Sequence, residues 1–344
     1  MRIGVPREVK DGEYRVALTP LGVKSLSNVV IEAGAGNGVG FSDDDYVKAG
    51  ATLGDPWDCE LVVKVKELQA AEYSRPRRGQ TVFGFQHFGP APPLLDAALA
   101  SDATFIAYET VGEAAGLPIL SPMSAIAGRL AVLAGAWCLQ KQNGGSGVLL
   151  PGVDGIAPGK VAIFGAGNVG SNALAVAHGM GAQVSVFARS EKRISLLRAK
   201  YPGVNFATGG QDRIDADLVI GGVLTPGQMS PKLISRAMLR GMRPGSALVD
   251  VGIDQGGIAE TSRPTSHSDP VYVEEGVVHY CVPNMPAACA RTASLALERA
   301  ALPFIIQLMK QTWDDNLKSG VQVRAGKVTH AHLARDTGRA YTAL

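Results

Sequence analysis

The chain has 344 residues, of which 46% are hydrophobic and 19% are charged, so it is long enough for two domains and too apolar for a disordered protein. Its formal net charge of +2 gives no electrostatic reason to expect binding to nucleic acid or to a membrane. The N-terminal segment MRIGVPREVK lacks the apolar core of a signal peptide, and the four cysteines form no C-x-x-C pair, so we expect a cytoplasmic protein with reduced thiols. His330 and His332 lack further partners at ligand spacing, so we expect no metal site.

Short apolar runs that alternate with helical patterns predict an α/β protein with parallel sheets. In the first third of the chain, Thr19 followed by Pro20 is typical of the start of a helix. The strands that we expect there cover residues 2–5, 61–65, 81–85 and 104–108.

The middle of the chain begins with a long apolar helical pattern over residues 124–142. Its most apolar part, 125–139, is interrupted by Arg129 and is too short to span a bilayer, so we expect a buried helix. The glycine-rich stretch 143–159 predicts an ordered loop or a short hairpin. The strands expected after it cover residues 160–164, 183–187, 218–221, 247–251 and 277–282.

A second helical pattern covers residues 288–310. The positions of this helix that we expect in the core are Leu295, Leu297, Leu302 and Ile306. We expect the helix to return to the first of two Rossmann-like domains that are separated by a cleft. The expected bounds are 1–120 plus 289–344 for a discontinuous substrate domain and 121–288 for a dinucleotide-binding domain.

The segment VAIFGAGNVG, residues 161–170, combines a strand, a tight glycine turn and the start of a helix. Gly165 permits the turn, Gly167 lets the backbone approach a pyrophosphate, and Gly170 lets the helix pack against the strand. The first amides of that helix supply donors for an anion. The alternative is a glycine-rich turn without a ligand, but the complete βαβ context favours a dinucleotide site.

The end of the second strand of this unit departs from a typical NAD site. NAD sites commonly place Asp or Glu there to bond the ribose 2′-hydroxyl. Here the position is Ala188, followed by Arg189, Ser190 and, in the next turn, Arg193. A 2′-phosphate would accept charge-assisted hydrogen bonds from such residues, so we favour NADP(H). The alternative is that the arginines are solvated surface charges and that the protein uses NAD(H).

Four polar residues outside the glycine turn are candidates for chemistry. Arg15 follows the first strand and is suited to hold a carboxylate, and Lys66 lies at the end of a parallel strand, where ligands bind. His87 follows an apolar strand, where it can donate to a carbonyl or move a proton. Asp254 follows a strand of the nucleotide domain, close to the expected nicotinamide. The structural alternatives are surface cations, a structural histidine and a turn aspartate.

Segments in order along nearly the whole chain together resemble the alanine dehydrogenase family and, more distantly, the nicotinamide nucleotide transhydrogenase α-subunit. The matching segments are RIGVPREVK, EYRVALTP, EAGAGNGVGFSDDDY, LVVKVKE, IAYETV, LSPMSAIAGRLA, VAIFGAGNVG, LVIGGVL, LVDVGIDQGG, SRPT and NMPA. So many ordered matches make the resemblance specific at the level of the family.

The resemblance implies roles for individual residues. Arg15 and Lys66 would hold the carboxylate and the carbonyl of a 2-oxo acid. His87 would bond the substrate and act as acid and base, and Asp254 would take part in proton transfer. The residues that would also line the substrate site are Met123 and Asn284. The residues that would contact the cofactor are Ser124, Gly165, Gly167, Asn168, Val169, Gly170, Ala188, Arg189, Ser190, Arg193, Val223, Leu224 and Ile253.

The reaction implied by the resemblance is reversible reductive amination of a small 2-oxo acid such as pyruvate. Ammonia and the 2-oxo acid give an imino acid through a carbinolamine, and the imine carbon then receives hydride from the nicotinamide. Lys66 would polarise the carbonyl more strongly once closure excludes water. The resemblance also implies a cytosolic homo-hexamer that acts on small molecules, with no nucleic-acid or membrane partner.

The chain departs from the family pattern in the cofactor and substrate segments. Ala188 stands where the family usually carries aspartate, and Leu68 replaces a proline after the Lys-Glu pair. Gln86 and Gly89 stand near His87 in a segment that usually reads Leu-His-Leu-Ala. These changes affect the prediction of the substrate more than the prediction of the reaction type. The main alternative is therefore an opine- or imine-type reductase, which joins an amino acid to a 2-oxo acid or reduces a cyclic imine with NADPH.

Two further alternatives use the same scaffold. A soluble transhydrogenase subunit would not need the set of Lys66, His87 and Asp254. A nucleotide-binding regulatory protein without catalysis would have no reason to retain these residues together with Arg15. The complete set therefore argues for an enzyme.

Overall fold

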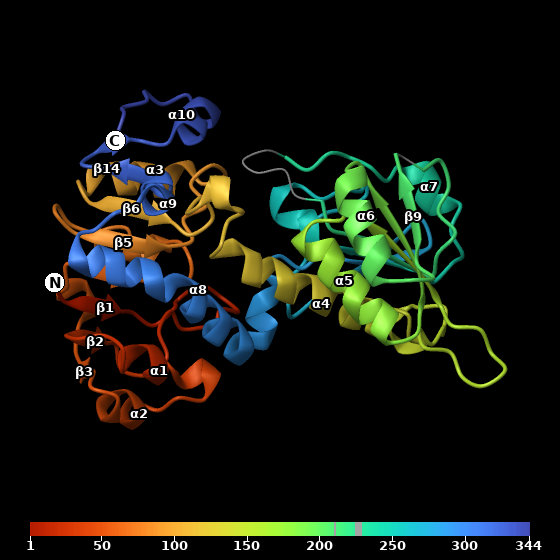
Figure 1. Cartoon of the computed structure of the whole chain (residues 1–344), viewed down its shortest axis with the longest axis horizontal. Coiled ribbons are helices and arrows are strands. Elements are labelled where there is room, and N and C mark those ends of the chain that lie inside the picture. The colour runs from red at the N-terminus through yellow and green to blue at the C-terminus, as the bar shows by residue number, and fades with distance from the viewer. Residues whose placement is uncertain (210, 224–228) are drawn as a thin grey trace. The chain divides into compact units, whose positions relative to one another are not determined.

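The computed structural model describes residues 1–209, 211–223 and 229–344 (Figure 1). They form two compact units, of which the first contains Met1–Met123 and Ala287–Leu344 and the second contains Ser124–Pro286. Both chain ends belong to the first unit, because the chain leaves it within helix α4 (Leu120–Cys138) and returns after the second unit is complete. Each unit combines a mostly parallel sheet with helices, which confirms the predicted α/β class.

An eight-stranded sheet organises the first unit, in the order β15-β14-β6-β5-β4-β1-β2-β3. The strands from β6 to β3 run parallel, whereas β14 and β15 are antiparallel to their neighbours. The segments that follow β1, β4 and β5 therefore meet at one edge of the sheet. The strands are β1 (Ile3–Val5), β2 (Val29–Ile31), β3 (Thr52–Leu53), β4 (Leu61–Val63), β5 (Thr81–Gly84), β6 (Thr104–Ala107), β14 (Val321–Arg324) and β15 (Lys327–Val328).

Several helices in the first unit begin with a side-chain cap. The expected start at Thr19 is present, since its hydroxyl accepts a hydrogen bond from the amide of Leu21 at 3.3 Å. The α-helices are α1 (Pro20–Val23), α2 (Asp43–Lys48), α3 (Pro92–Ala100), α8 (Ala290–Lys310), α9 (Asp315–Ser319) and α10 (Ala331–Thr337). The 3-10 helices of the chain are η1 (Asn37–Val39), η2 (Pro56–Asp58), η3 (Ala70–Glu72), η4 (Glu113–Ala115), η5 (Lys141–Asn143), η6 (Val251–Gln255) and η7 (Met285–Cys289).

The predicted core of α8 is only partly correct. Leu297 is buried, but Leu295 is 39% exposed, and Leu302 and Ile306 are only half-buried. The buried stripe of the helix consists of Ala290, Ala293, Ser294, Leu297, Glu298, Ala301, Phe304, Ile305 and Leu308. Small alanines occupy this stripe because the helix packs closely on its neighbours, so the large apolar residues alone do not mark its inner face.

A seven-stranded sheet organises the second unit, in the order β12-β13-β11-β10-β7-β8-β9. Only β12 among these strands is antiparallel to its neighbour. The predicted βαβ unit is present, since β7 leads through a helix to the adjacent parallel strand β8. The strands are β7 (Lys160–Phe164), β8 (Gln183–Ala188), β9 (Asn205–Thr208), β10 (Leu218–Gly221), β11 (Ala247–Asp250), β12 (Val271–Glu274) and β13 (Val277–Tyr280). The helices are α5 (Asn168–Gly179), α6 (Glu191–Lys200) and α7 (Arg236–Arg240).

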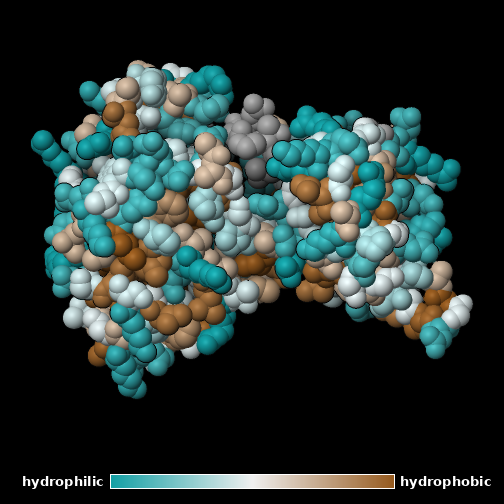
Figure 2. Space-filling view, in the orientation of Figure 1, coloured by the Kyte–Doolittle hydropathy of each residue, from teal (hydrophilic) through white to brown (hydrophobic). Residues whose placement is uncertain are grey.

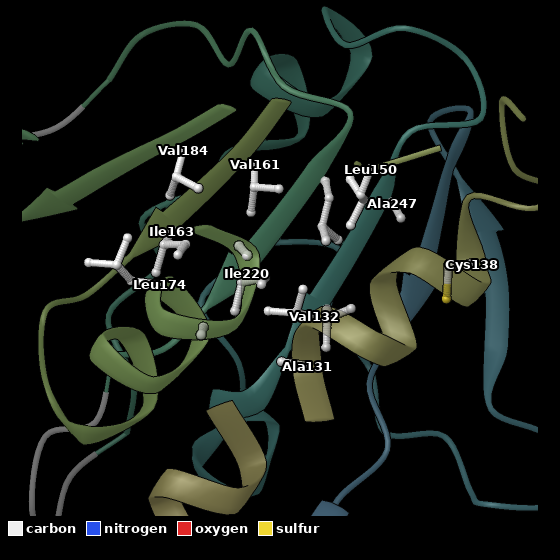
Figure 3. Close-up of a cluster of buried hydrophobic side chains, with 14 of the residues drawn as sticks. Ala131, Val132, Cys138, Leu150, Val161, Ile163, Leu174, Val184, Ile220 and Ala247 are labelled. Atoms are coloured by element: carbon white, nitrogen blue, oxygen red, sulfur yellow. The ribbon is translucent and has the colours of Figure 1, made fainter. Parts of the chain in front are cut away.

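Helix α4 contributes to the core of the second unit (Figure 3). Its residues Ala131, Val132 and Cys138 belong to one buried cluster with Ile220 of β10 and Ala247 of β11. Within the described part of the chain, α4 is the one helix long and apolar enough to cross a membrane. Only one face of α4 packs in this cluster: 33% of its apolar window is buried, and Leu133 and Trp137 are 53% and 39% exposed, so the expectation of a buried helix is wrong. One such helix is a weak indication of a membrane segment.

The helix predicted over 124–142 is displaced toward the N-terminus. It starts at Leu120, because Pro122 is tolerated in the first turn of a helix. It ends at Cys138, and the chain then forms η5, which closes at Gly144 with a φ of +84°. The residues after α4 therefore belong to a turn that requires glycine.

Candidate functional site

The glycine turn after β7 has the geometry that a bound pyrophosphate requires. Gly165 has a φ of +111°, which side chains rarely adopt. A Cβ atom on Gly170 would overlap the carbonyl oxygen of Gly165, so α5 packs directly on the turn. Gly167 is the N-cap of α5 and has no side chain to bond the first amides of the helix. The turn and the helix N-terminus therefore fit the phosphates of a dinucleotide.

A cation borders this turn. Strand β8 ends at the half-buried Ala188, and Arg189 and Ser190 follow it on the surface. The hydroxyl of Ser190 caps α6 by accepting a hydrogen bond from the amide of Arg193 at 3.4 Å. A Cβ atom on Gly167 would lie 3.3 Å from Nη1 of Arg193. A guanidinium thus lies beside the glycine turn, near the strand end where NAD sites commonly carry a carboxylate.

Those of the other predicted cofactor contacts that the structure describes lie around the same sheet edge or in α4. Val223 follows β10, and its Cγ2 atom would lie 3.2 Å from a Cβ atom on Gly165. Asn168 and Val169 form the first turn of α5. The remaining ones are Ile253, which is buried in η6, Ser124, which is half-buried in α4, and Leu224, which lies outside the described residues.

A buried aspartate shapes the loop after β11. The carboxylate of Asp250 accepts hydrogen bonds from the amides of Gly252 at 3.1 Å and Ile258 at 2.7 Å, and from the hydroxyl of Ser262 at 2.5 Å. These bonds hold η6 in place, and Asp254 lies exposed on it. Asp254 therefore lies on an ordered loop that the hydrogen bonds of the buried Asp250 hold in place.

Arg15 is buried in the first unit, so the surface alternative for this residue is wrong. Glu13 pairs with it through two bonds, Nε to Oε1 at 2.7 Å and Nη2 to Oε2 at 2.6 Å. Its Nη1 atom contacts Sδ of Met123 at 3.3 Å. The structure thus brings two predicted substrate residues together and fixes the plane of the guanidinium.

Lys66 and His87 meet at one carboxylate, that of Glu67. Nδ1 of His87 lies 3.0 Å from Oε2 of Glu67, and Nζ of Lys66 lies 3.5 Å from the same oxygen. Lys10 forms a further ion pair with this carboxylate. The ring of Phe85 stacks on His87 with centroids 5.7 Å apart, and Nζ of Lys66 lies 5.7 Å from the Phe85 centroid.

The backbone of His87 is held in an uncommon conformation. Its φ is +45°, which costs energy for a residue other than glycine. The carboxylate of Glu109 accepts hydrogen bonds from the amides of Gln86 at 3.1 Å and His87 at 2.8 Å. The side chain of His87 is 38% exposed. The imidazole therefore reaches solvent from a fixed backbone, as expected for a residue that meets a ligand.

Lys64 and Lys66 are both buried, so the alternative that Lys66 is a surface cation is wrong. Nζ of Lys64 pairs with Glu72 at 2.9 Å and with Glu8 at 3.3 Å. Burial lowers the pKa of Lys64, but the two carboxylates outweigh burial and raise it, so Lys64 stays charged. Glu8 also accepts a hydrogen bond from the amide of Val65 at 2.7 Å. This buried network anchors the segment that carries Lys66.

The predicted residues are distributed over both units. The first unit contains Arg15, Lys66, His87 and Met123, and the second contains Ser124, Asp254 and Asn284 together with the glycine turn. Asn284 has a φ of +56° immediately before η7. In the described ranges, no group of three or more His, Cys, Asp and Glu side chains is arranged to hold a metal ion.

Three acidic residues at the site are not predicted from the sequence. Glu13 and Glu67 lie within two positions of Arg15 and Lys66 in the sequence. A buried cation needs a nearby acid, so the neighbouring opposite charges could have indicated these two residues. Glu109 gives no such signal. It reaches His87 because β5 pairs with β6, which brings residues 22 positions apart together.

Models of one protein family match both parts of the chain. The model described as the N-terminal domain of alanine dehydrogenase/PNT matches residues 4–127, and the model of its C-terminal domain matches residues 131–331. The alanine dehydrogenase of Halomonas elongata is 48% identical, with 99% of this chain and 98% of that protein covered. That of Bacillus subtilis is 43% identical, with 99% and 96% covered.

Solved structures give the same result. An L-alanine dehydrogenase matches with a TM-score of 0.93 and 42% identity, covering 98% of this chain and 99% of its own. A transhydrogenase from Sinorhizobium meliloti matches with a TM-score of 0.82 and 26% identity, covering 96% and 99%. A dipicolinate synthase A chain from Bacillus subtilis, at 16% identity and a TM-score of 0.51, shares the fold alone.

Proposed function

The chain belongs to the alanine dehydrogenase/PNT family, and from this membership we propose that it catalyses reversible reductive amination of pyruvate or a closely related small 2-oxo acid. It is an alanine dehydrogenase-like, nicotinamide-dependent oxidoreductase, as the sequence predicts. The observation that carries the finer proposal is the cluster of Lys66, Glu67 and His87, which a protein that only binds nucleotides would not need. In this proposal the first unit binds the substrate and the second binds the dinucleotide.

The substrate carboxylate is assigned to Arg15. Glu13 engages the Nε–Nη2 edge of the guanidinium, and Nη1 lies beside Met123. A substrate carboxylate would form a charge-assisted hydrogen bond with this guanidinium. Asn284 is a further candidate for substrate binding by family resemblance. A substrate held in this way has only one orientation of its carbonyl, which supplies much of the catalytic effect of positioning.

Lys66 and His87 are assigned to the reacting carbonyl. The ammonium of Lys66 would polarise the carbonyl oxygen, and its low exposure strengthens this interaction. His87 would give a proton to the hydroxyl that leaves as water and take it back in the reverse direction. Asp254 would accept a proton from the attacking amine. When bound, the reduced nicotinamide supplies the hydride that completes the reduction.

NADP(H) is our proposed cofactor, with NAD(H) as the alternative. Support comes from Ala188, which offers no carboxylate to a ribose 2′-hydroxyl, and from Arg193, whose guanidinium lies beside the glycine turn. Arg189 and Ser190 lie exposed at the end of the same strand. These residues suit a 2′-phosphate, because a phosphate accepts several charge-assisted hydrogen bonds.

We further propose a cytoplasmic homo-oligomer, a hexamer by family resemblance. The cysteines Cys59, Cys138, Cys281 and Cys289 are free thiols, which suits a reducing compartment. Leu149, Val153 and Ile156 are exposed on the loop between η5 and β7, whose apolar tip is brown in Figure 2. Such an apolar patch suits burial against a second copy of the chain. Light scattering of the wild type and an Ile156→Glu variant tests this, and a monomeric wild type would exclude it.

A substrate panel tests the proposed function. The purified protein is supplied with reduced cofactor, one 2-oxo acid and one amine, and cofactor oxidation is followed by absorbance. We expect oxidation that requires ammonia and is fastest with pyruvate or a 2-oxo acid of similar size. Oxidation that instead requires an amino acid or a cyclic imine would replace the proposal with an imine-type reductase. Oxidation without any amine would indicate reduction to a 2-hydroxy acid.

A further inference from the structure

One carboxylate, that of Glu67, joins three cationic or donor groups from three different segments. Lys10 comes from the chain after β1, Lys66 from the chain after β4 and His87 from the chain after β5. We propose that Glu67 is a positioning residue that fixes the tautomer and the orientation of the His87 ring. The proton is then held on Nδ1, and Nε2 is the nitrogen that exchanges a proton with the substrate. The substrate part of this inference rests on the function proposed above.

The geometry is that of an oriented base. Oε2 of Glu67 lies 3.0 Å from Nδ1 of His87, within ordinary hydrogen-bond distance. The Glu67 side chain is only 12% exposed, whereas that of His87 is 38% exposed. The carboxylate is therefore behind the ring and the ring faces outward. A base that is oriented by a third group in this way is a recurring arrangement at catalytic sites.

The charge of Glu67 determines which ring nitrogen carries the proton. Burial raises the pKa of the Glu67 carboxyl, but the hydrogen bond from His87 and the charges of Lys66 and Lys10 outweigh burial and hold that pKa well below its usual range. An ionised carboxylate can only accept hydrogen bonds. Nδ1 of neutral His87 must therefore carry the hydrogen, which leaves the lone pair on Nε2.

Glu67 and Glu109 contact different parts of His87. Glu109 binds the backbone amides of Gln86 and His87 and so holds the strained φ of +45°. Of the atoms of His87, the Glu67 carboxylate contacts only the ring. Loss of the Glu67 carboxylate should therefore release the ring without releasing the backbone, which separates positioning from folding.

Solid-state NMR of protein labelled with ¹⁵N-histidine tests the tautomer directly. The chain has six histidines, and the His87 signals are identified by their loss in His87→Asn. In the wild type, at a pH where the ring is neutral, we expect Nδ1 of His87 to be protonated and Nε2 unprotonated. In Glu67→Ala we expect the opposite tautomer to appear. An Nε2-protonated ring in the wild type, or an unchanged spectrum in Glu67→Ala, would overturn the proposal.

Kinetics provide the second readout. We expect Glu67→Ala to lower kcat by about 100-fold, as for the loss of an oriented acid or base, while the KM for the cofactor changes little. Asp96→Ala is the matched control, since it removes a carboxylate from the exposed ion pair with Arg339 in the same unit. An unchanged kcat in Glu67→Ala would contradict the role. If the wild type shows no reductive amination at all, the proposed function fails, but the NMR result still decides the tautomer.

Discussion

Gly170 lies so close to the carbonyl oxygen of Gly165 that no side chain fits between them. The contact joins the first turn of α5 to the end of β7, the place where a dinucleotide would meet the backbone. Packing of the helix and shape of the binding turn therefore depend on the same glycine.

Gly170→Ala should weaken both properties. The added methyl group must push α5 away from the turn, which costs about 1–3 kcal/mol of the free energy of unfolding. Cofactor affinity should fall with it, because the first amides of α5 move. Thermal unfolding and fluorescence titration with NADPH and NADH measure the two effects. Gly179→Ala in the same helix is the control, since a Cβ atom there meets nothing within 4 Å. Equal behaviour of the two variants would contradict the packing argument.

Ala188→Asp should shift the cofactor preference toward NADH. The new carboxylate would repel a 2′-phosphate and could accept a hydrogen bond from a 2′-hydroxyl. The measurement is the ratio of kcat/KM for NADPH to that for NADH. Ala188→Asn has the same size without the charge and should shift this ratio much less. If the ratio is the same in the wild type and in Ala188→Asp, the end of β8 does not determine cofactor preference.

Lys66→Ala should abolish most of the activity while cofactor binding is kept. Loss of the ammonium removes the group assigned to the reacting carbonyl, so kcat should fall by about 100-fold or more. The dissociation constant for the cofactor should stay within about threefold. A change of that size corresponds to less than about 1 kcal/mol of binding free energy. Lys48→Ala, on the exposed side of α2, is the control. Equal losses in kcat and cofactor affinity would mean that Lys66 is structural.

Asp254→Asn separates proton transfer from the shape of the loop. Asp250 holds η6 through its own hydrogen bonds, so the loop should persist when Asp254 becomes an amide. We expect kcat to fall by about 100-fold with an unchanged unfolding temperature. A drop in unfolding temperature together with kcat would assign Asp254 to the fold instead.

The second unit should lose stability as the pH falls below about 6.5. Burial lowers the pKa of His279, whose ring nitrogens lie 2.8 Å from the carbonyl oxygen of Val277 and from Oγ1 of Thr261. The unfolded chain, with a pKa near 6.5, therefore binds the proton first. The contribution of neutral His279 to the free energy of unfolding is therefore complete above this pH. It decreases as the pH falls toward the pKa of the folded state. Unfolding midpoints from about pH 7.5 to about pH 5 should fall less steeply in His279→Gln. Parallel curves would refute the assignment to His279.

Strong local patterns predict much of the fold. β7 and β10 have the expected bounds of 160–164 and 218–221, because each is a continuous apolar run between turn residues. Strands β2, β3, β9, β12, β14 and β15 are not predicted from the sequence, and pairing with their neighbouring strands defines them. Local patterns also fail for the end of α4, which turn glycines determine, and for the exposed Leu295, which close helix packing leaves outside the core.

Site residues can be predicted from the sequence where a charged or titratable residue directly follows a predicted strand. Lys66 and His87 follow β4 and β5, which are adjacent in the sheet, so topology brings them together. Burial of Lys64 and the bonds from Glu109 to His87 depend on pairing between distant segments. No local pattern carries that information.

Incorporation of labelled ammonia tests the central claim most directly. The protein is incubated with ¹⁵N-ammonium, pyruvate and either NADPH or NADH, and the products are analysed by mass spectrometry. We predict ¹⁵N-labelled alanine in an amount equal to the cofactor oxidised, with NADPH the better donor. Cofactor oxidation without ¹⁵N in an amino acid, or no oxidation with any 2-oxo acid and ammonia, would contradict it.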